Sequence, residues 1–155
     1  MADTDTDTAT ITAVRTQARE LFGRLLELLE TGDIEAWVDL FHEDGVLEFP
    51  FPPPGWGTTI KGHEALLGHM KNFPEQLDVR FSDVVFHETT DPELLVAEFT
   101  GTGTARATGR PFHQSYVSLI WIKDGKVSRF KDFWNPLVTV EALGGLEAIA
   151  RIVDN

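Results

Sequence analysis

The stretch that decides the fold is residues 110–136, with the sequence RPFHQSYVSLIWIKDGKVSRFKDFWNP. Pro111 to Ile122 and Lys126 to Trp134 have the composition and alternation of β-strands. Asp124-Gly125 lies between them, and an Asp-Gly pair favours the tight turn of a β-hairpin because both turn residues must adopt positive φ angles. We therefore predict that these two segments form an antiparallel hairpin.

Two more strand-like segments, Leu77 to His87 and Leu94 to Arg106, precede this hairpin. Turn signals at Asp91-Pro92 and Thr108-Gly109 separate them from their neighbours, and strands joined by short turns form an antiparallel meander. The N-terminal half of the chain has helical periodicity instead. Helices grouped before strands predict an α+β fold, with the helices packed on one face of a curved sheet.

The elements outside the meander follow from apolar spacing and from helix stop signals. Gly32 is placed to end the first helix, and Asp33 to cap the second helix. The expected elements are a helix over residues 9–30, a shorter helix whose Ile34, Trp37 and Phe41 share one face, a strand from Val46 to Phe49, a stiff proline-rich loop over 50–57, a helix over 62–72 that ends before Pro74 and, after the meander, a helical turn from Leu137 to Leu143.

The composition is that of one globular domain. The chain has 155 residues, and we predict a single domain over residues 9–145 between a disordered tail (1–8) and a C-terminal tail (146–155). The formal net charge of -12 argues against nucleic acid as a partner. The sequence contains no cysteine, no signal peptide and no apolar run that could cross a membrane, so we predict a cytoplasmic protein without a membrane partner.

The segment from Tyr116 to Ile122 is apolar on both of its alternating faces. A sheet with one face in water would not tolerate this pattern. If the row with Ser118 faces the helices, the row with Val117 and Trp121 faces away and needs another cover. The simplest cover is a second copy of the chain, so we predict a homodimer through the sheet.

One carboxylate stands out in the second strand of the hairpin. Asp132 lies in the same alternating row as Phe130 and Trp134, so an inward-facing side chain there has aromatic neighbours. A carboxylate removed from water is costly unless it is paired or takes part in chemistry. Asp132 is either an exposed acid that pairs with Lys131 or Arg129, or a general acid or base whose pKa is raised by apolar walls.

A histidine and the single tyrosine add polar groups to the inner side. His69 falls on the side of its helix that Ala65 and Met70 define, where it is either a core histidine with one hydrogen bond or a donor or proton carrier in a cavity. Tyr116 is either a core aromatic residue or the phenol that stabilises an oxyanion. His63 is six residues from His69, so the pair lacks the spacing of a helical zinc site, and we predict no bound metal.

Several stretches resemble one known superfamily. They are DLFHEDGV at residues 39–46, the loop at 50–62, GRPFHQSYV at 109–117, DGKV at 124–127 and DFWNP at 132–136. Over residues 13–143 the chain is similar to the nuclear transport factor 2-like superfamily, in its SnoaL-like and ketosteroid-isomerase-like branch. The resemblance implies a cone-shaped α+β barrel, a fold that hosts isomerases, cyclases, dehydratases, epoxide hydrolases and binding proteins.

The resemblance also points to individual positions. Where ketosteroid isomerases have their carboxylate base this chain has Phe49, and near their second acid it has Ser118, so the likeness does not extend to their steroid chemistry. The chain looks closer to the phenazine-biosynthesis A/B proteins and to the SnoaL-like polyketide cyclases. In the former, the pocket acid of the last long strand is a glutamate at the position of Asp132, and of two polar helix positions only His69 is polar here.

We therefore expect an enzyme of isomerase, cyclase or lyase type that needs no cofactor and acts on a small, apolar, cyclic or polyketide-like molecule. Asp132 would transfer a proton, while His69 and Tyr116 polarise a carbonyl or hydroxyl group. The alternatives are a binding protein without catalysis and a dimeric scaffold whose pocket is filled by its own side chains. The residues expected to bind substrate are Trp37, Phe49, Phe51, Trp56, Gln114, Ser118 and Trp134.

Overall fold

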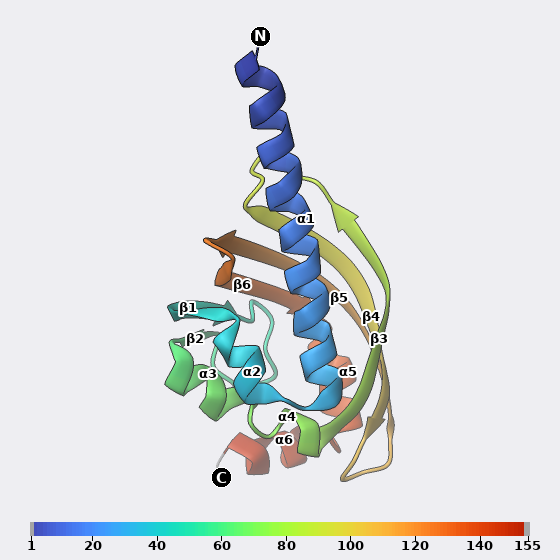
Figure 1. Ribbon diagram of the computed structural model, residues 1–155. Coiled ribbons are helices and arrows are strands. Elements are labelled where there is room, and N and C mark those ends of the chain that lie inside the picture. Colours follow the sequence, from blue (N-terminus) through green and yellow to red (C-terminus); the bar gives the residue numbers. More distant parts are fainter. Residues whose placement is uncertain (1, 154–155) are drawn as a thin grey trace.

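The computed structural model describes residues 2–153 and has helices packed against one face of a curved sheet (Figure 1). The long helix α1 crosses the concave side of the sheet, where it contacts strands β3 and β4. The elements are α1 (Ala2–Thr31), α2 (Ile34–Asp39), β1 (Phe41–Glu48), β2 (Thr59–Lys61), α3 (His63–Met70), α4 (Phe73–Gln76), β3 (Leu77–His87), β4 (Leu94–Ala105), β5 (Pro111–Lys123), β6 (Lys126–Trp134), α5 (Pro136–Ala142) and α6 (Leu146–Val153).

The strands form one sheet with the order β2-β1-β6-β5-β4-β3. The pair β1 and β6 is parallel, and the other neighbouring pairs are antiparallel. Because β2 and β3 remain as two edges, the sheet curves strongly without closing into a barrel. The predicted α+β cone and its antiparallel meander are confirmed, whereas the parallel contact between β1 and β6 was not part of the prediction.

The Asp-Gly turn sets which side chains of β5 and β6 meet. Asp124 and Gly125 have φ angles of 51° and 77°, the positive values that the sequence predicts. The turn aligns the two strands so that Ser118 lies opposite Asp132 and Tyr116 lies opposite Trp134. The hairpin therefore places the candidate acid directly across from a hydroxyl group.

Two glycines in β4 make room for neighbouring strands. A Cβ atom at Gly103 would overlap the backbone oxygen of Asp78 in β3, so only glycine permits this close approach. A Cβ atom at Gly101 would lie 3.0 Å from Cε2 of Tyr116. Gly101 thus leaves space on the inner face for the tyrosine ring.

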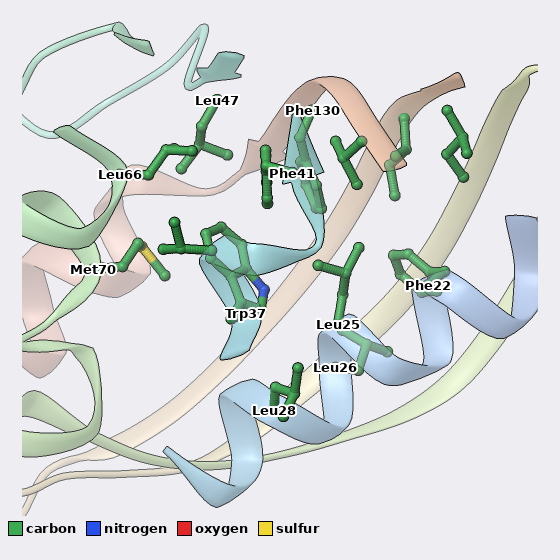
Figure 2. Packing of buried hydrophobic residues seen from close by; sticks show 14 of the residues in the cluster. Phe22, Leu25, Leu26, Leu28, Trp37, Phe41, Leu47, Leu66, Met70 and Phe130 are labelled. Atoms are coloured by element: carbon green, nitrogen blue, oxygen red, sulfur yellow. The ribbon is translucent and has the colours of Figure 1, made fainter. Parts of the chain in front are cut away.

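The main core lies between the sheet and the N-terminal helices. Asp33 caps α2 by accepting a hydrogen bond of 3.1 Å from the backbone N–H of Ala36, as expected. Trp37 of α2 packs against Phe41, with ring centroids 4.7 Å apart. Figure 2 shows Trp37 lying among side chains from α1, α3 and β1. The core thus joins the helices to the edge of the sheet that carries β1.

Three local expectations are wrong. Phe41 is not part of the second helix but begins β1, although it is fully buried as expected. Ala65 is exposed, because α3 turns Leu66 and Met70 toward the core. Helix α3 ends before Pro74 as expected, and Pro74 itself occupies the first turn of the short helix α4. The strand expected over 46–49 starts earlier, at Phe41, and an irregular register between Phe41 and Val46 obscures its pattern.

The chain ends also differ from the predicted tails. Helix α1 already starts at Ala2 and so includes residues 2–8, for which a disordered tail is expected. Helix α6 covers residues 146–153, where a second tail is expected, and it buries Ile149 against Leu143 and Ala142. This apolar contact explains why the C-terminal segment forms a helix and packs on the domain.

The two faces of β5 alternate as the sequence indicates. Ser118 and Ile120 are fully buried on the concave side, while Val117 is 37% exposed on the convex side. None of the helices in the described part of the chain is long and apolar enough to cross a membrane.

Candidate functional site

A cavity of about 500 Å³ lies on the concave side of the sheet. Its walls come from the helices α1 to α4, the strands β1 and β3 to β6, the loop before β2 and the C-terminal helices α5 and α6. A volume of this size accepts a small organic molecule. The cavity therefore argues against the scaffold alternative, in which the chain's own side chains fill the pocket.

Asp132 is the acid of this cavity. Its neighbour across the strands, Ser118, donates a hydrogen bond of 2.8 Å from Oγ to Oδ1 of the carboxyl group. Burial raises the pKa of Asp132 to about 7, and the bond from Ser118 opposes this shift in part. Asp132 keeps a partial exposure and lines the cavity, so the surface left to it faces this hollow rather than bulk solvent. Among the described residues no donor binds the second oxygen, Oδ2.

The two alternatives for Asp132 are thereby separated. Arg129, one candidate ion-pair partner, binds Glu48 instead, with distances of 2.8 and 3.0 Å from its Nε and Nη2 to the two carboxylate oxygens. Lys131, the other candidate, contacts the ring of Phe133 at 5.6 Å from the centroid. Asp132 is therefore an inward acid and not a member of a surface ion pair.

Tyr116 lies on β5, two residues before Ser118. Its ring stacks on Phe99 with a centroid distance of 4.7 Å and an interplanar angle of 4°. Burial, and to a lesser degree the charge of Asp132, raise the pKa of Tyr116 above its ordinary value. The phenol therefore keeps its proton and can act as a hydrogen-bond donor to a ligand in the cavity that it lines.

His69 lies on α3 across the cavity from the sheet. Its ring contacts Phe49 and Trp56, with centroid distances of 5.4 and 6.0 Å. Burial lowers the pKa of His69, so the imidazole is neutral at pH 7. No described residue hydrogen-bonds to the ring, so the reading as a core histidine with one such bond is not supported. A neutral imidazole can offer one donor and one acceptor to a ligand.

Aromatic rings close one end of the cavity. Phe49, His69, Trp56 and Trp134 contact each other in a cycle, with successive centroid distances of 5.4, 6.0, 6.3 and 5.6 Å. Trp37 is 2% exposed and also lines the cavity. The indole N–H groups of Trp37 and Trp56 are buried without a hydrogen-bond partner in the described protein. Four of the residues expected to bind substrate therefore line this cavity: Trp37, Phe49, Trp56 and Trp134.

Three residues expected to bind substrate lie elsewhere or serve another purpose. Phe51 is 61% exposed and packs on Phe133 at the convex face, because the proline-rich loop turns it outward. Gln114 is buried, but its amide binds the backbone of Asn135, donating to the carbonyl at 2.8 Å and accepting from the N–H at 3.0 Å. Ser118 donates its hydroxyl proton to Asp132. Gln114 therefore positions the backbone at Asn135, and Ser118 positions the carboxyl group of Asp132.

Sequence reasoning missed several walls of the cavity. Leu25 and Leu29 of α1 line the cavity, although no site residue was expected in this helix. Gln76 of α4 adds an amide, and Ile152 of α6 lies in the segment expected to be a tail. The inward rows of β3 and β4 were a usable signal, because Phe81 and Phe99 follow the strand alternation. A set of three or more residues suited to hold a metal ion is absent from the described part of the chain.

Comparisons with known proteins agree with this architecture. Residues 22–130 match the family model of the SnoaL-like domain. An uncharacterised PhzA/B-like protein of Pseudomonas aeruginosa is 52% identical over 136 residues, which cover 88% of this chain and 96% of that protein.

Two solved structures are also similar. A Bacillus subtilis protein with a provisional assignment as an isomerase has a TM-score of 0.81 and 34% identity, covering 84% of this chain and 94% of that one. A Xanthomonas campestris protein with a provisional assignment as a polyketide cyclase has a TM-score of 0.71 at 17% identity, covering 83% of this chain and 98% of that one, and shows the fold alone. The chain belongs to the SnoaL-like domain family and, within it, to the PhzA/B-like proteins.

Proposed function

We propose that this chain is an enzyme that needs no cofactor and that isomerises, cyclises or cleaves a small, largely apolar ring compound or polyketide-like molecule by moving a proton through Asp132. The observation that carries the proposal is the carboxyl group of Asp132, which lines an aromatic cavity with a pKa of about 7. Near neutral pH such a group exists in both its acid and base forms, which suits it to accept and return a proton. A solvated aspartate would remain a weak base.

The proposed step moves one proton and one electron pair. Oδ2 of ionised Asp132 accepts a proton from a carbon next to a ligand carbonyl, and the electrons of the C–H bond form an enolate. Tyr116 donates a hydrogen bond to the enolate oxygen, because its raised pKa keeps the phenol protonated. Protonated Asp132 then returns the proton to another atom of the enolate, which gives an isomer. In the alternative course the enolate carbon attacks a second carbonyl, which closes a ring, and protonated Asp132 gives its proton to the alkoxide that forms. His69 supplies a further neutral polar group.

The relatives support the general kind of reaction. The chain belongs to the SnoaL-like family, and the Bacillus subtilis structure carries a provisional assignment as an isomerase. The family and this name together support a function of the isomerase kind. Neither of them identifies the substrate, which we infer from the side chains that line the cavity.

Hydrogen exchange on a simple ketone tests the proposal without knowledge of the natural substrate. The probe is 2-tetralone in D₂O, and NMR follows deuterium incorporation next to the carbonyl. The wild-type protein should accelerate exchange over buffer, and Asp132→Asn should abolish the acceleration. Asp44→Asn, which changes an exposed acid of β1, is the matched control and should behave like wild type. Exchange that is equally fast in Asp132→Asn would refute the assignment.

The alternative function is ligand binding without catalysis in the same cavity. It is favoured by the unpartnered indole N–H groups of Trp37 and Trp56, which a bound acceptor could satisfy after a small adjustment of the wall. It predicts that a ligand binds equally well to wild type and Asp132→Asn, while the wild-type protein accelerates no exchange.

We also propose that two copies pair through the convex face of the sheet. A second hollow lies there, lined among others by Phe51, Val85, Val117 and Phe133. The first three of these side chains are exposed by 61%, 51% and 37% in the single chain. Such contiguous apolar surface is typical of an interface. The cytoplasmic location and the absence of nucleic-acid and membrane partners stay predictions.

A further inference from the structure

The charges around the cavity restrict what it can hold. Among the described residues that line it, Asp132 is the only acid, and Lys71 is the only residue with a permanent positive charge. Lys71 caps the C-terminal end of α3 and is exposed to solvent. Neutral His69 supplies no positive charge. The interior thus holds no cation that could pair with an acidic ligand.

We infer that the ligand of this cavity is a ring compound that has a carbonyl or hydroxyl group and carries no carboxylate group. The inference rests on the proposed function for the choice of site, but not on the proton-transfer step. Among the largely apolar ring compounds of the proposed function, it excludes those that carry a carboxylate group.

The exclusion of carboxylates follows from desolvation and repulsion. Moving an ionised carboxylate from water into the cavity without a partner costs far more free energy than burial of the attached ring gains. Such a ligand therefore stays in water or binds only after its carboxylate is protonated. Asp132, once ionised, adds repulsion at short range in a medium of low dielectric constant. The net charge of -12 adds a weaker repulsion at longer range. Lys71 is solvated and flexible, so it can attract an anion only to the mouth.

The preference for rings follows from the wall itself. Phe49, Trp56 and Trp134 present both edges and faces to one another at centroid distances of 5.6 and 6.3 Å. Flat ligands can add to such an arrangement by offset or edge-to-face contacts. The polar groups of the wall that have no hydrogen-bond partner among the described residues include Oδ2 of Asp132, the hydroxyl group of Tyr116, the ring nitrogens of His69, the indole N–H groups of Trp37 and Trp56 and the side-chain amides of Asn72 and Gln76. They can donate to a carbonyl group or accept from a hydroxyl group of the ligand.

Two probes of the same ring system and different charge test the inference. Isothermal titration calorimetry at about pH 8 compares 2-naphthol, which is neutral there, with 2-naphthoate, which is an anion. The wild-type protein should bind 2-naphthol at least about tenfold more tightly than 2-naphthoate. In Asp132→Asn the affinity for 2-naphthoate should rise, because the repulsion is gone, but it should stay below that for 2-naphthol.

Two variants locate the binding. Gly68 lines the cavity and is exposed, and a Cβ atom there would meet none of the surrounding atoms within 4 Å. The ring that Gly68→Phe adds should obstruct the mouth of the cavity and abolish 2-naphthol binding. Lys71→Met should leave the affinity for 2-naphthol unchanged, because Lys71 is exposed at the mouth of the cavity. Binding of 2-naphthoate that equals or exceeds that of 2-naphthol in wild type, binding of 2-naphthol that survives Gly68→Phe, or no binding of either probe would overturn the inference.

The outcome is distinguishable from a failure of the proposed function. If Asp132→Asn exchanges 2-tetralone as fast as wild type while 2-naphthol still binds more tightly than 2-naphthoate, the proton shuttle is wrong and the ligand class stands. If 2-naphthoate binds as tightly as 2-naphthol, the ligand class is wrong whatever the exchange experiment shows.

Discussion

Two carboxylates on neighbouring strands show that the two faces of this sheet shift the pKa of a carboxyl group in opposite directions. Glu48 of β1 lies beside Lys131 of β6 on the convex face, and the next residue of β6, Asp132, points into the cavity. The hydrogen bonds of Arg129 lower the pKa of Glu48, whereas burial raises that of Asp132 to about 7. The environment that the sheet gives each face, and not the residue type, therefore decides which carboxylate can transfer a proton near neutral pH.

The largest expected effect concerns the inner carboxylate alone. Asp132→Asn should lower the rate of 2-tetralone exchange by about 10²- to 10⁴-fold, since it removes the general base. Glu48→Gln removes the outer carboxylate and should leave that rate unchanged, because its partner Arg129 faces away from the cavity. Equal losses in the two variants would mean that the two faces do not differ in the way described.

The stability of the protein should depend on pH through Asp132. Its pKa in the folded state is above the ordinary value of 3.8, so the folded protein binds this proton more tightly than the unfolded chain. The stabilisation is therefore complete at low pH and is lost as the pH rises through about 7. Between about pH 5 and about pH 8 the free energy of unfolding should fall by about 2 to 3 kcal/mol from this group.

Urea unfolding at the two pH values measures this fall. Asp132→Asn should remove it. Glu48→Gln should retain it, because the pKa of Glu48 is lowered and its contribution is lost only as the pH falls through that lowered value, below this window. An Asp132→Asn protein with the same pH dependence as wild type would show that the inner carboxylate has an ordinary pKa.

Much of this contrast could be predicted from the sequence. Strict alternation in β5 and β6 and the Asp-Gly turn between them place Asp132 on the concave side, and apolar spacing places His69 on the inner side of α3. Both signals are local, since they depend on a repeat of two or about four residues and on one turn.

The remaining features depend on contacts between distant segments. The alternation of β5 predicts that Gln114 and Ser118 face the interior. Only the structure shows that Gln114 hydrogen-bonds to Asn135 and Ser118 to Asp132. The parallel contact of β1 with β6 joins segments more than 80 residues apart, such as Phe41 and Val127. No local pattern fixes the direction of Phe51, because its loop has no repeat.

A smaller change tests how the inner carboxylate is held. Ser118→Ala removes the hydrogen bond that opposes the raised pKa, so the pKa of Asp132 should rise further, and the exchange rate should need a higher pH to reach its maximum. Ser128→Ala is the control, because Ser128 donates to the backbone oxygen of Trp121 at 3.0 Å and does not touch Asp132. A pH profile that does not move in Ser118→Ala would mean that this hydroxyl group does not act on Asp132.

A substitution on the convex face should disrupt the proposed dimer without any effect on the cavity. Val117→Asp places a charge at the centre of the proposed interface, so sedimentation should show monomers where wild type forms dimers. The exchange rate should stay within about twofold of wild type, because Val117 and the inner row point to opposite sides. A monomeric wild-type protein would contradict the dimer and leave the account of the inner face intact.

The most direct test is a ¹³C NMR titration of the Asp132 carboxyl carbon, assigned by comparison with Asp132→Asn. The account predicts a midpoint of about 7 in the free protein, with an upward shift in Ser118→Ala. A midpoint near 4, the value of a solvated aspartate, would contradict it, because burial in the cavity would then not raise the pKa of this carboxyl group.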